Sequence, residues 1–262
     1  MLAPGRYSQS PEQGTMKTDK ALAWLRNLGH IRTTAAVMVV LYAVGTAAHL
    51  YRPTLGLMTA MTPWFLLACG LAVIWPSIGT GGKRFLLWGA AVYIVSFFLE
   101  ALGVASGLVF GEYRYGPTLG LAASGVPLVI AFNWAVVVYG AVRMAGRRKR
   151  SDFMTAVMTG AVATMFDWIM EPVAIRLDYW TWASGHIPLQ NYLAWFVIAA
   201  ASAFAYRKLV SSAVQPANGD LADGERADGE LADGAGTLAG FYVLVQAGFF
   251  AALRAGWAIA GC

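Results

Sequence analysis

Three carboxylic acids interrupt stretches of the sequence that otherwise resemble the apolar core of a membrane helix: Glu100, Asp167 and Glu171. Ionisable side chains inside a bilayer are costly and usually face the interior of a helix bundle, where they serve function. Asp167 and Glu171 are four residues apart, so on a helix they share one face and their like charges repel. We therefore expect at least one of the two to carry a proton or to be hydrogen-bonded.

An aromatic pair follows two of these acids at the same distance. Tyr113 in "EYRYG" comes thirteen residues after Glu100, and Trp180 in "DYWTW" comes thirteen residues after Asp167. Aromatic residues are common at the membrane interface, but their repeated spacing beside each acid indicates that they belong to a site. The second members of the two aromatic-x-aromatic motifs are Tyr115 and Trp182.

The depth of each polar residue follows from a helical rise of about 1.5 Å per residue. Glu100 lies sixteen residues beyond Arg84, which places it about 24 Å into a hydrocarbon core about 30 Å thick. Asp167 lies fifteen residues beyond Asp152, at a similar depth. Five polar side chains from four helices are thus expected to meet in one layer toward the outer face: His49, Glu100, Asp167, Glu171 and Asn191.

Such a layer predicts acid–base chemistry on a lipid-soluble molecule. A carboxyl group in apolar surroundings keeps its proton near neutral pH and can act as a general acid. Protonation of an isoprenoid double bond gives a tertiary cation, which aromatic π faces stabilise. A second carboxylate could then orient water, as in a hydratase, or remove a proton after ring closure, as in a cyclase.

The sequence offers no motif for a nucleotide, metal or other cofactor. It has no G-x-G-x-x-G after a strand, no Walker sequence and no G-x-S-x-G elbow. The three histidines are scattered at His30, His49 and His186, whereas metal sites need several converging ligands. We therefore expect neither a cofactor nor a metal.

The composition predicts that membrane helices position these residues. The chain is 58% hydrophobic and 13% charged, about half of the charged fraction of soluble domains. We predict an all-α integral membrane protein that forms one bundle of seven transmembrane helices. The expected spans are 33–51, 57–76, 84–106, 122–142, 153–171, 188–206 and 238–260.

Charge predicts the orientation of this bundle. With a cytoplasmic N-terminus, fifteen Lys and Arg residues lie on the cytoplasmic side and three, Arg52, Arg114 and Arg176, lie outside. This bias follows the positive-inside rule. An odd number of spans then places the C-terminus outside the cell (inner) membrane.

Four segments organise the chain. Residues 1–32 form a polar cytoplasmic segment, 33–210 a six-helix membrane core, 211–236 an acidic linker and 237–262 the seventh helix. The linker contains the repeat "LADGERADGELADGA", whose Gly, Asp and Glu content predicts a flexible segment.

A longer repeat relates two parts of the core. Seven residues separate Pro127 from Trp134, as they separate Pro188 from Trp195. Each of the two units has an ascending helix with a carboxylate, an aromatic-x-aromatic loop and a descending helix. Because both units have the same orientation, the pattern predicts a parallel two-helix internal repeat rather than an inverted one.

Four motifs of the sequence resemble the membrane carotenoid hydratases of the bacterioruberin and gamma-carotene pathways. These motifs are "FFLEALGVASGLVFGEYRYG", "SGVPLVI", "FDWIMEPVAIRLDYWTW" and "GHIPLQNYLAW". The resemblance covers roughly residues 85–200. It implies addition of water to the terminal double bond of an acyclic carotenoid end group, lycopene-like or C50, without a redox cofactor. The stretch around His186 and Ala194 departs from the family pattern, which leaves the identity of the substrate open.

The site hypothesis combines these arguments. Asp167 or Glu100 donates the proton, and Glu171 and Asn191 position water. The remaining candidates are expected to bind the substrate: His49, Tyr113, Tyr115, Trp180 and Trp182. The alternatives are a carotenoid cyclase that uses the same protonation step, and a non-catalytic membrane carrier or pigment-binding protein.

Overall fold

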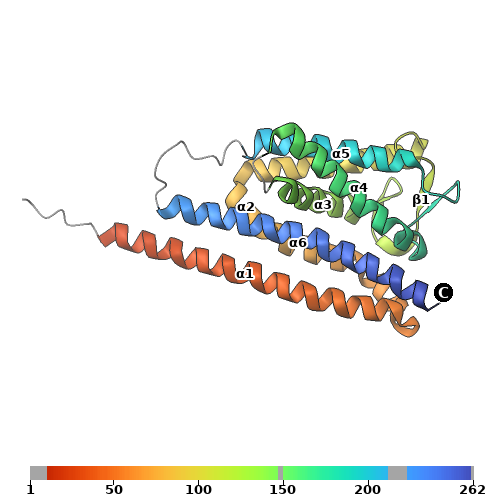
Figure 1. Ribbon diagram of the computed structural model, residues 1–262, viewed down its shortest axis with the longest axis horizontal. Helices are drawn as coiled ribbons and strands as arrows, with labels where there is room; N and C mark the ends of the chain where they lie inside the picture. Colours follow the sequence, from red (N-terminus) through yellow and green to blue (C-terminus); the bar gives the residue numbers. More distant parts are fainter. Residues whose placement is uncertain (1–10, 147–149, 212–222, 261–262) are drawn as a thin grey trace, which may run out of the picture.

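Helices make up most of the computed structural model, which describes residues 11–146, 150–211 and 223–260. Five of the six helices in these ranges, all but α5, are long and apolar enough to cross a membrane. The prediction of an all-α membrane protein is thus confirmed at this level (Figure 1). The helices are α1 (Pro11–Leu50), α2 (Arg52–Ser106), α3 (Leu128–Gly146), α4 (Asp152–Arg176), α5 (Leu189–Leu209) and α6 (Asp223–Ile259).

Helix α2 has 55 residues and contains a break at Gly82, whose φ of 54° and ψ of −151° are not helical. Glycine tolerates this backbone because it has no Cβ. Near one end of α2, Pro63 lies close to Gly120, and near the other end Val104 lies close to Gly125. Both ends therefore reach the same loop region, so the chain folds back at Gly82. The two halves of α2 correspond to the predicted spans 57–76 and 84–106, while the total of seven spans stays a prediction.

The helices form two neighbouring groups. Helices α1 and α6 lie side by side along one edge of the molecule, and α3, α4 and α5 pack together beside them (Figure 1). Helix α4 begins at Ser151, whose side chain accepts a hydrogen bond from the Met154 backbone N–H at 3.2 Å. Such a cap satisfies one of the unpaired N–H groups at the helix start. Asp152 then binds Arg207 and Lys208 of α5 at 2.9 and 2.8 Å, which ties α4 to α5 at this end.

The aromatic-x-aromatic motifs are strands rather than the loops that the sequence predicts. β1 (Tyr113–Tyr115) pairs antiparallel with β4 (Trp180–Trp182), so that Tyr113 faces Trp182 and Tyr115 faces Trp180. A second small sheet pairs β2 (Ala122–Ala123) with β3 (Val126–Pro127), after the 3-10 helix η1 (Pro117–Leu119). Because strands need partners distant in sequence, an isolated three-residue motif does not reveal them.

Two predicted boundaries differ from the structure. The span expected at 122–142 begins at Leu128, because the six preceding residues include the paired strands β2 and β3. The acidic linker expected at 211–236 is helical from Asp223 onward, as the start of α6. The central part of the predicted linker, 212–222, lies outside the described residues.

The two aromatic motifs that the predicted repeat matches to each other also pair with each other as strands. Tyr113 and Tyr115 match Trp180 and Trp182 in the two units, and the two strands pair about the central Arg114–Thr181 pair. A local two-fold relation would produce such self-complementary pairing. The repeat itself stays a prediction.

Candidate functional site

The first acid, Glu100, is held by the tyrosines of β1. The hydroxyl groups of Tyr113 and Tyr115 both donate hydrogen bonds to Glu100 Oε2, the second at 2.8 Å. Glu100 lies six residues before the end of α2 and is buried. The chain reverses direction in the short segment between α2 and β1, which brings the two tyrosines over the Glu100 carboxyl group. Glu100 Oε1 receives no hydrogen bond from the described residues.

The other two acids lie on α4 and share one amide. The Asn191 Nδ2 atom donates to Asp167 Oδ2 at 2.7 Å and to Glu171 Oε1 at 3.2 Å. The indole N–H groups of Trp180 and Trp182 donate to Glu171 Oε2 at 3.0 and 3.1 Å. Glu171 therefore accepts three N–H groups, whereas Asp167 accepts one.

The carboxylate that binds the tryptophans differs from the one that the sequence spacing suggests. The thirteen-residue offset matches Trp180 to Asp167, but its indole N–H reaches Glu171, one helical turn further along α4. The difference arises because β4 follows a turn at Leu177 and Asp178 that sets how far the strand folds back over the helix. Glu171, rather than Asp167, is thus the structural counterpart of Glu100.

A glycine makes the pairing of β1 with β4 possible. The Gly116 backbone N–H donates to the Tyr179 carbonyl oxygen at 2.9 Å. A Cβ atom on Gly116 would lie 2.1 Å from the Asp178 carbonyl oxygen, which no side chain could tolerate. Asp178 itself has a φ of 56°, in the left-handed region. This close approach brings both aromatic strands over the acids.

The acids and the aromatic rings enclose one small pocket of about 250 Å³. The unfilled space at its centre leaves room for about one water molecule. Trp134 of α3 stacks on Trp195 of α5, with ring centroids 3.6 Å apart, and Phe110 stacks on the same Trp195 at 5.3 Å. We call this space the acid pocket. It is lined by Glu100, Phe110, Tyr113, Trp134, Asp167, Glu171, Trp180, Trp182, Asn191 and Trp195.

Burial and the nearby Glu100 carboxylate raise the pKa of Tyr113 and of Tyr115 well above the ordinary value for tyrosine. Burial is the larger cause for both groups, since an apolar environment disfavours the phenolate. Both hydroxyl groups therefore keep their protons at physiological pH. A protonated hydroxyl can donate to a carboxylate or, after rotation, accept from a carboxylic acid.

The structure brings together four of the five predicted polar residues. Glu100, Asp167, Glu171 and Asn191 line the acid pocket, but His49 lies outside it, in a separate apolar cavity. His49 therefore lies apart from the other four residues, and its role in substrate binding stays a prediction. Depth along a span does not determine which side of a helix a residue faces, and the side chain of His49 is directed to α6, where its ring packs on Phe249 at 5.2 Å.

Sequence reasoning did not place the stacked rings of the acid pocket. Trp134 and Trp195 served only as markers of the repeat, although their matched spacing from Pro127 and Pro188 was the available signal. Phe110 had no such signal. Among the described residues, no group of three or more His, Cys, Asp or Glu side chains is arranged to hold a metal ion.

The fold and the pocket define a class: a helical membrane protein with buried carboxyl groups under an aromatic cover. The family model described as carotenoid biosynthesis protein matches residues 61–223, and the chain belongs to this family. It therefore takes part in carotenoid biosynthesis. The matched region contains every residue that lines the acid pocket.

A curated relative extends this finding. The chain is 25% identical over 193 residues to a bisanhydrobacterioruberin hydratase from Haloarcula japonica, an alignment that covers 69% of this chain. The chain spans 66% of the length of that relative, just under two thirds. No solved structure matches the chain.

Proposed function

We propose that this protein adds water to the terminal carbon–carbon double bond of an acyclic carotenoid end group, lycopene-like or C50, and so forms a tertiary alcohol. The observation that carries the proposal is the acid pocket, where carboxyl groups from two helices face one space under aromatic rings. The carotenoid family and the relative named as a hydratase support the same reaction. The protein is then a cofactor-independent hydro-lyase.

The hydrogen bonds support Asp167 as the proton donor. An indole N–H can only donate, so Glu171 Oε2, which faces two of them, must act as an acceptor. Glu171 Oε1 also receives an N–H, from Asn191. Hydrogen bonds to a carboxylate favour its ionised form. Glu171 is therefore the anion of the pair, and the like-charge repulsion across one helical turn keeps the proton on Asp167.

The reaction begins when Asp167 transfers this proton to the CH carbon of the double bond. The π electrons form the new C–H bond, and the positive charge develops on the neighbouring carbon, which bears two methyl groups. The aromatic rings that line the pocket and the Glu171 carboxylate stabilise this tertiary cation. The aromatic cover also keeps bulk water from reaching the cation.

Water completes the addition from the side of Glu100. A lone pair of the water molecule forms the C–O bond, and the released proton passes to Glu100. Glu100 suits this step because its partners are tyrosine hydroxyl groups, which can turn to accept when the carboxyl group gains a proton. The next water in the pocket returns the proton to Asp167, so no net proton is consumed.

The orientation in the membrane belongs to the same proposal. We place the N-terminus in the cytoplasm and the C-terminus outside, with the chain crossing the cell (inner) membrane seven times, twice through the two halves of α2. The charge bias supports this orientation. The acid pocket then lies toward the outer face of the membrane, where a carotenoid would arrive laterally from the lipid.

Expression in cells that accumulate lycopene tests the reaction. A hydratase adds the mass of one water molecule per reacted end, a cyclase changes the absorbance at unchanged mass, and a carrier changes neither. We expect the hydrated product by mass spectrometry. An unchanged mass in the presence of folded, membrane-inserted protein would overturn the proposal for this substrate, and a C50 acyclic carotenoid is the second substrate to test.

A further inference from the structure

A second and larger cavity lies beside the acid pocket, between α1, the first half of α2 and α6. Its volume is about 500 Å³, within the range of roughly 300–1,000 Å³ for most small-molecule sites. Its wall is mostly apolar, with side chains such as Phe65, Met170 and Phe250. Trp64 and Val44 are exposed at its rim, so the cavity opens between α1 and α2 on the apolar outer surface of the bundle. We call this space the apolar cavity.

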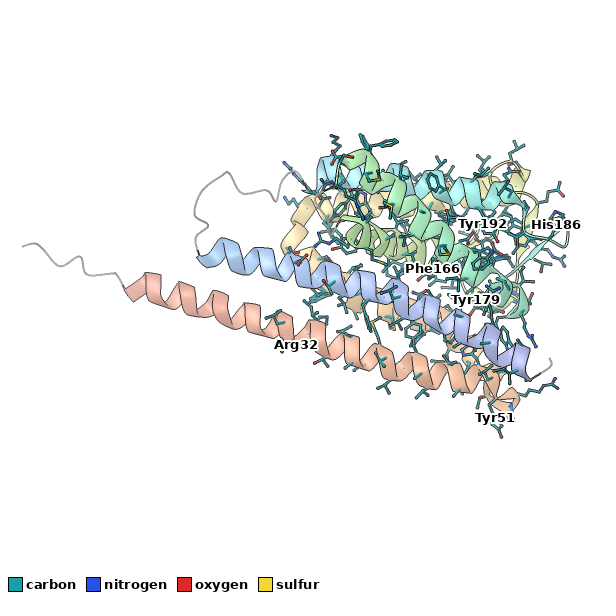
Figure 2. The ribbon with its side chains drawn as sticks, viewed as in Figure 1. Arg32, Tyr51, Phe166, Tyr179, His186 and Tyr192 are labelled. Carbon is teal, nitrogen blue, oxygen red and sulfur yellow. The ribbon has the colours of Figure 1, made fainter. Side chains whose placement is uncertain are left out.

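Trp180 belongs to the walls of both spaces. Its indole N–H binds Glu171 in the acid pocket, while the same residue contributes to the end of the apolar cavity. Tyr179, which precedes it and is labelled in Figure 2, also lines the apolar cavity, and its hydroxyl group donates to Thr62 Oγ1 of α2 at 3.5 Å. Trp180 is therefore a wall that the apolar cavity and the acid pocket share.

Three polar atoms in this apolar wall lack hydrogen-bond partners among the described residues: the Tyr42 hydroxyl oxygen, which can also donate, and the two atoms His49 Nε2 and Gln246 Oε1. Both residues are buried, with relative exposures of 8% for His49 and 1% for Gln246. They belong to the neighbouring helices α1 and α6, and the Phe249 ring, three residues after Gln246, packs on the His49 ring at 5.2 Å. A buried polar atom without a partner costs free energy, which a ligand could recover.

The hydrogen bonds on the other atoms of these side chains show what the ligand must supply. His49 Nδ1 lies 2.7 Å from the Gly45 carbonyl oxygen, which can only accept, so Nδ1 carries the proton. Gln246 Nε2 donates to Asn133 Oδ1 at 3.2 Å, and Asn133 is held in turn by the Tyr242 hydroxyl at 2.9 Å. Both free atoms, His49 Nε2 and Gln246 Oε1, are therefore acceptors. Their partner must be a donor.

We propose that the apolar cavity binds an elongated isoprenoid that carries a hydroxyl group, and that the single proton of this hydroxyl is shared between the acceptors His49 Nε2 and Gln246 Oε1. An alcohol fits the site because it is neutral, it donates, and its hydrocarbon chain fills the rest of the cavity. The inference rests on the proposed function only in so far as the bound molecule is taken to be the substrate.

Binding of two C15 isoprenoids to the purified full-length protein tests this site. Farnesol and farnesene differ chiefly in the hydroxyl group, and tryptophan fluorescence follows both because Trp64 and Trp180 line the apolar cavity. We expect farnesol to bind about tenfold more tightly, the gain typical of one net hydrogen bond. Equal affinity for the two compounds in the wild-type protein would overturn the proposal without any variant.

Two variants then locate the hydroxyl contact. His49→Phe and Gln246→Leu should each reduce the preference for farnesol to about threefold or less, while the affinity for farnesene stays within about twofold. Gln190→Leu is the matched control, since Gln190 lies outside the cavity and is exposed. A preference that survives both substitutions would contradict the assignment, and an equal loss for both compounds would indicate that the residues only maintain packing.

The binding assay separates this site from the proposed reaction. A protein that prefers farnesol through His49 and Gln246 but hydrates no carotenoid would retain the hydroxyl site and refute the hydratase function. A protein that hydrates lycopene but binds farnesol and farnesene equally would support the hydratase function and refute the hydroxyl site.

Discussion

The two halves of the acid pocket hold their carboxyl groups with different donors. Tyrosine hydroxyl groups of β1 bind Glu100, whereas tryptophan N–H groups of β4 bind Glu171. Both strands belong to one small antiparallel sheet, so the backbone arrangement on the two sides is alike. The difference lies in the chemistry of the donor and in the presence of Asp167 on one side.

This difference assigns a role to each half. An indole N–H donates in every state of its partner, so it holds Glu171 in one form. A hydroxyl group can donate or accept, so it tolerates gain and loss of a proton by Glu100. We infer that the tryptophan half keeps a fixed anion beside the proton donor Asp167, and that the tyrosine half receives the proton which water releases.

Replacing one acid in each half of the acid pocket should give the largest effects. Asp167→Asn should lower hydration by about 10³-fold, because removal of a general acid typically costs 10²–10⁴. Glu100→Gln should cost less, about 10²-fold, because the Glu171 carboxylate in the same pocket can in part take the released proton. The measurement is product formation per amount of membrane-inserted protein. Full activity in both variants would refute the roles of the two acids.

Removal of the shared amide should have the next largest effect. Asn191→Leu deletes one bond to the Glu171 carboxylate and one to Asp167, and we expect a loss of about 10- to 100-fold, since hydrogen bonds to charged groups contribute about 1.5–3 kcal/mol. The neighbouring Gln190→Leu is the control and should stay within about twofold. Equal activities of Asn191→Leu and Gln190→Leu would show that the Asn191 amide does not position the Asp167 and Glu171 carboxyl groups.

A smaller change should disturb only the tyrosine half. A Cβ atom on Gly103 would lie 2.7 Å from the Phe110 ring and 3.5 Å from the Tyr113 hydroxyl. Gly103→Ala should therefore shift Phe110 and reduce activity several-fold, since small displacements of a positioned group are costly. Gly89→Ala on the same helix meets nothing within 4 Å and should be neutral. Equal activities of the two variants would show that this half tolerates displacement.

The smallest expected effect concerns alkaline stability. The raised pKa of Tyr115 keeps it neutral in the folded protein, whereas an unfolded tyrosine ionises near pH 10. Above about pH 10 the unfolded state binds fewer protons than the folded state, so stability falls as the pH rises. Tyr115→Phe should make this decline less steep in thermal unfolding, and Trp180→Phe should leave its slope unchanged. An identical slope in wild type and Tyr115→Phe would contradict the assignment.

Much of the candidate site could be predicted from the sequence because membrane burial makes polar residues conspicuous. Glu100, Asp167, Glu171 and Asn191 stand out in apolar helices for that reason, and the repeated aromatic spacing indicated their cover. The partner of each acid could not be predicted in the same way. Whether Trp180 reaches Asp167 or Glu171 depends on how the turn at Asp178 returns the strand, a contact between segments that spacing does not encode.

The helices show the same limit. Hydropathy places most of the predicted spans within the helices of the structure, including the two halves of α2 on either side of the break at Gly82. It does not show which face of α1 turns toward α6, so it could not separate His49 from the residues of the acid pocket. Figure 2 shows Arg32 on α1 and Tyr51 just beyond the far end of this helix.

Infrared spectroscopy of the membrane-inserted protein tests the central claim, that Asp167 carries the catalytic proton and Glu171 is an anion. A protonated carboxyl group has a carbonyl stretch separate from that of a carboxylate. We predict that Asp167→Asn removes such a band from the wild-type spectrum and that Glu171→Gln does not. Loss of the band in Glu171→Gln, with its retention in Asp167→Asn, would contradict the account.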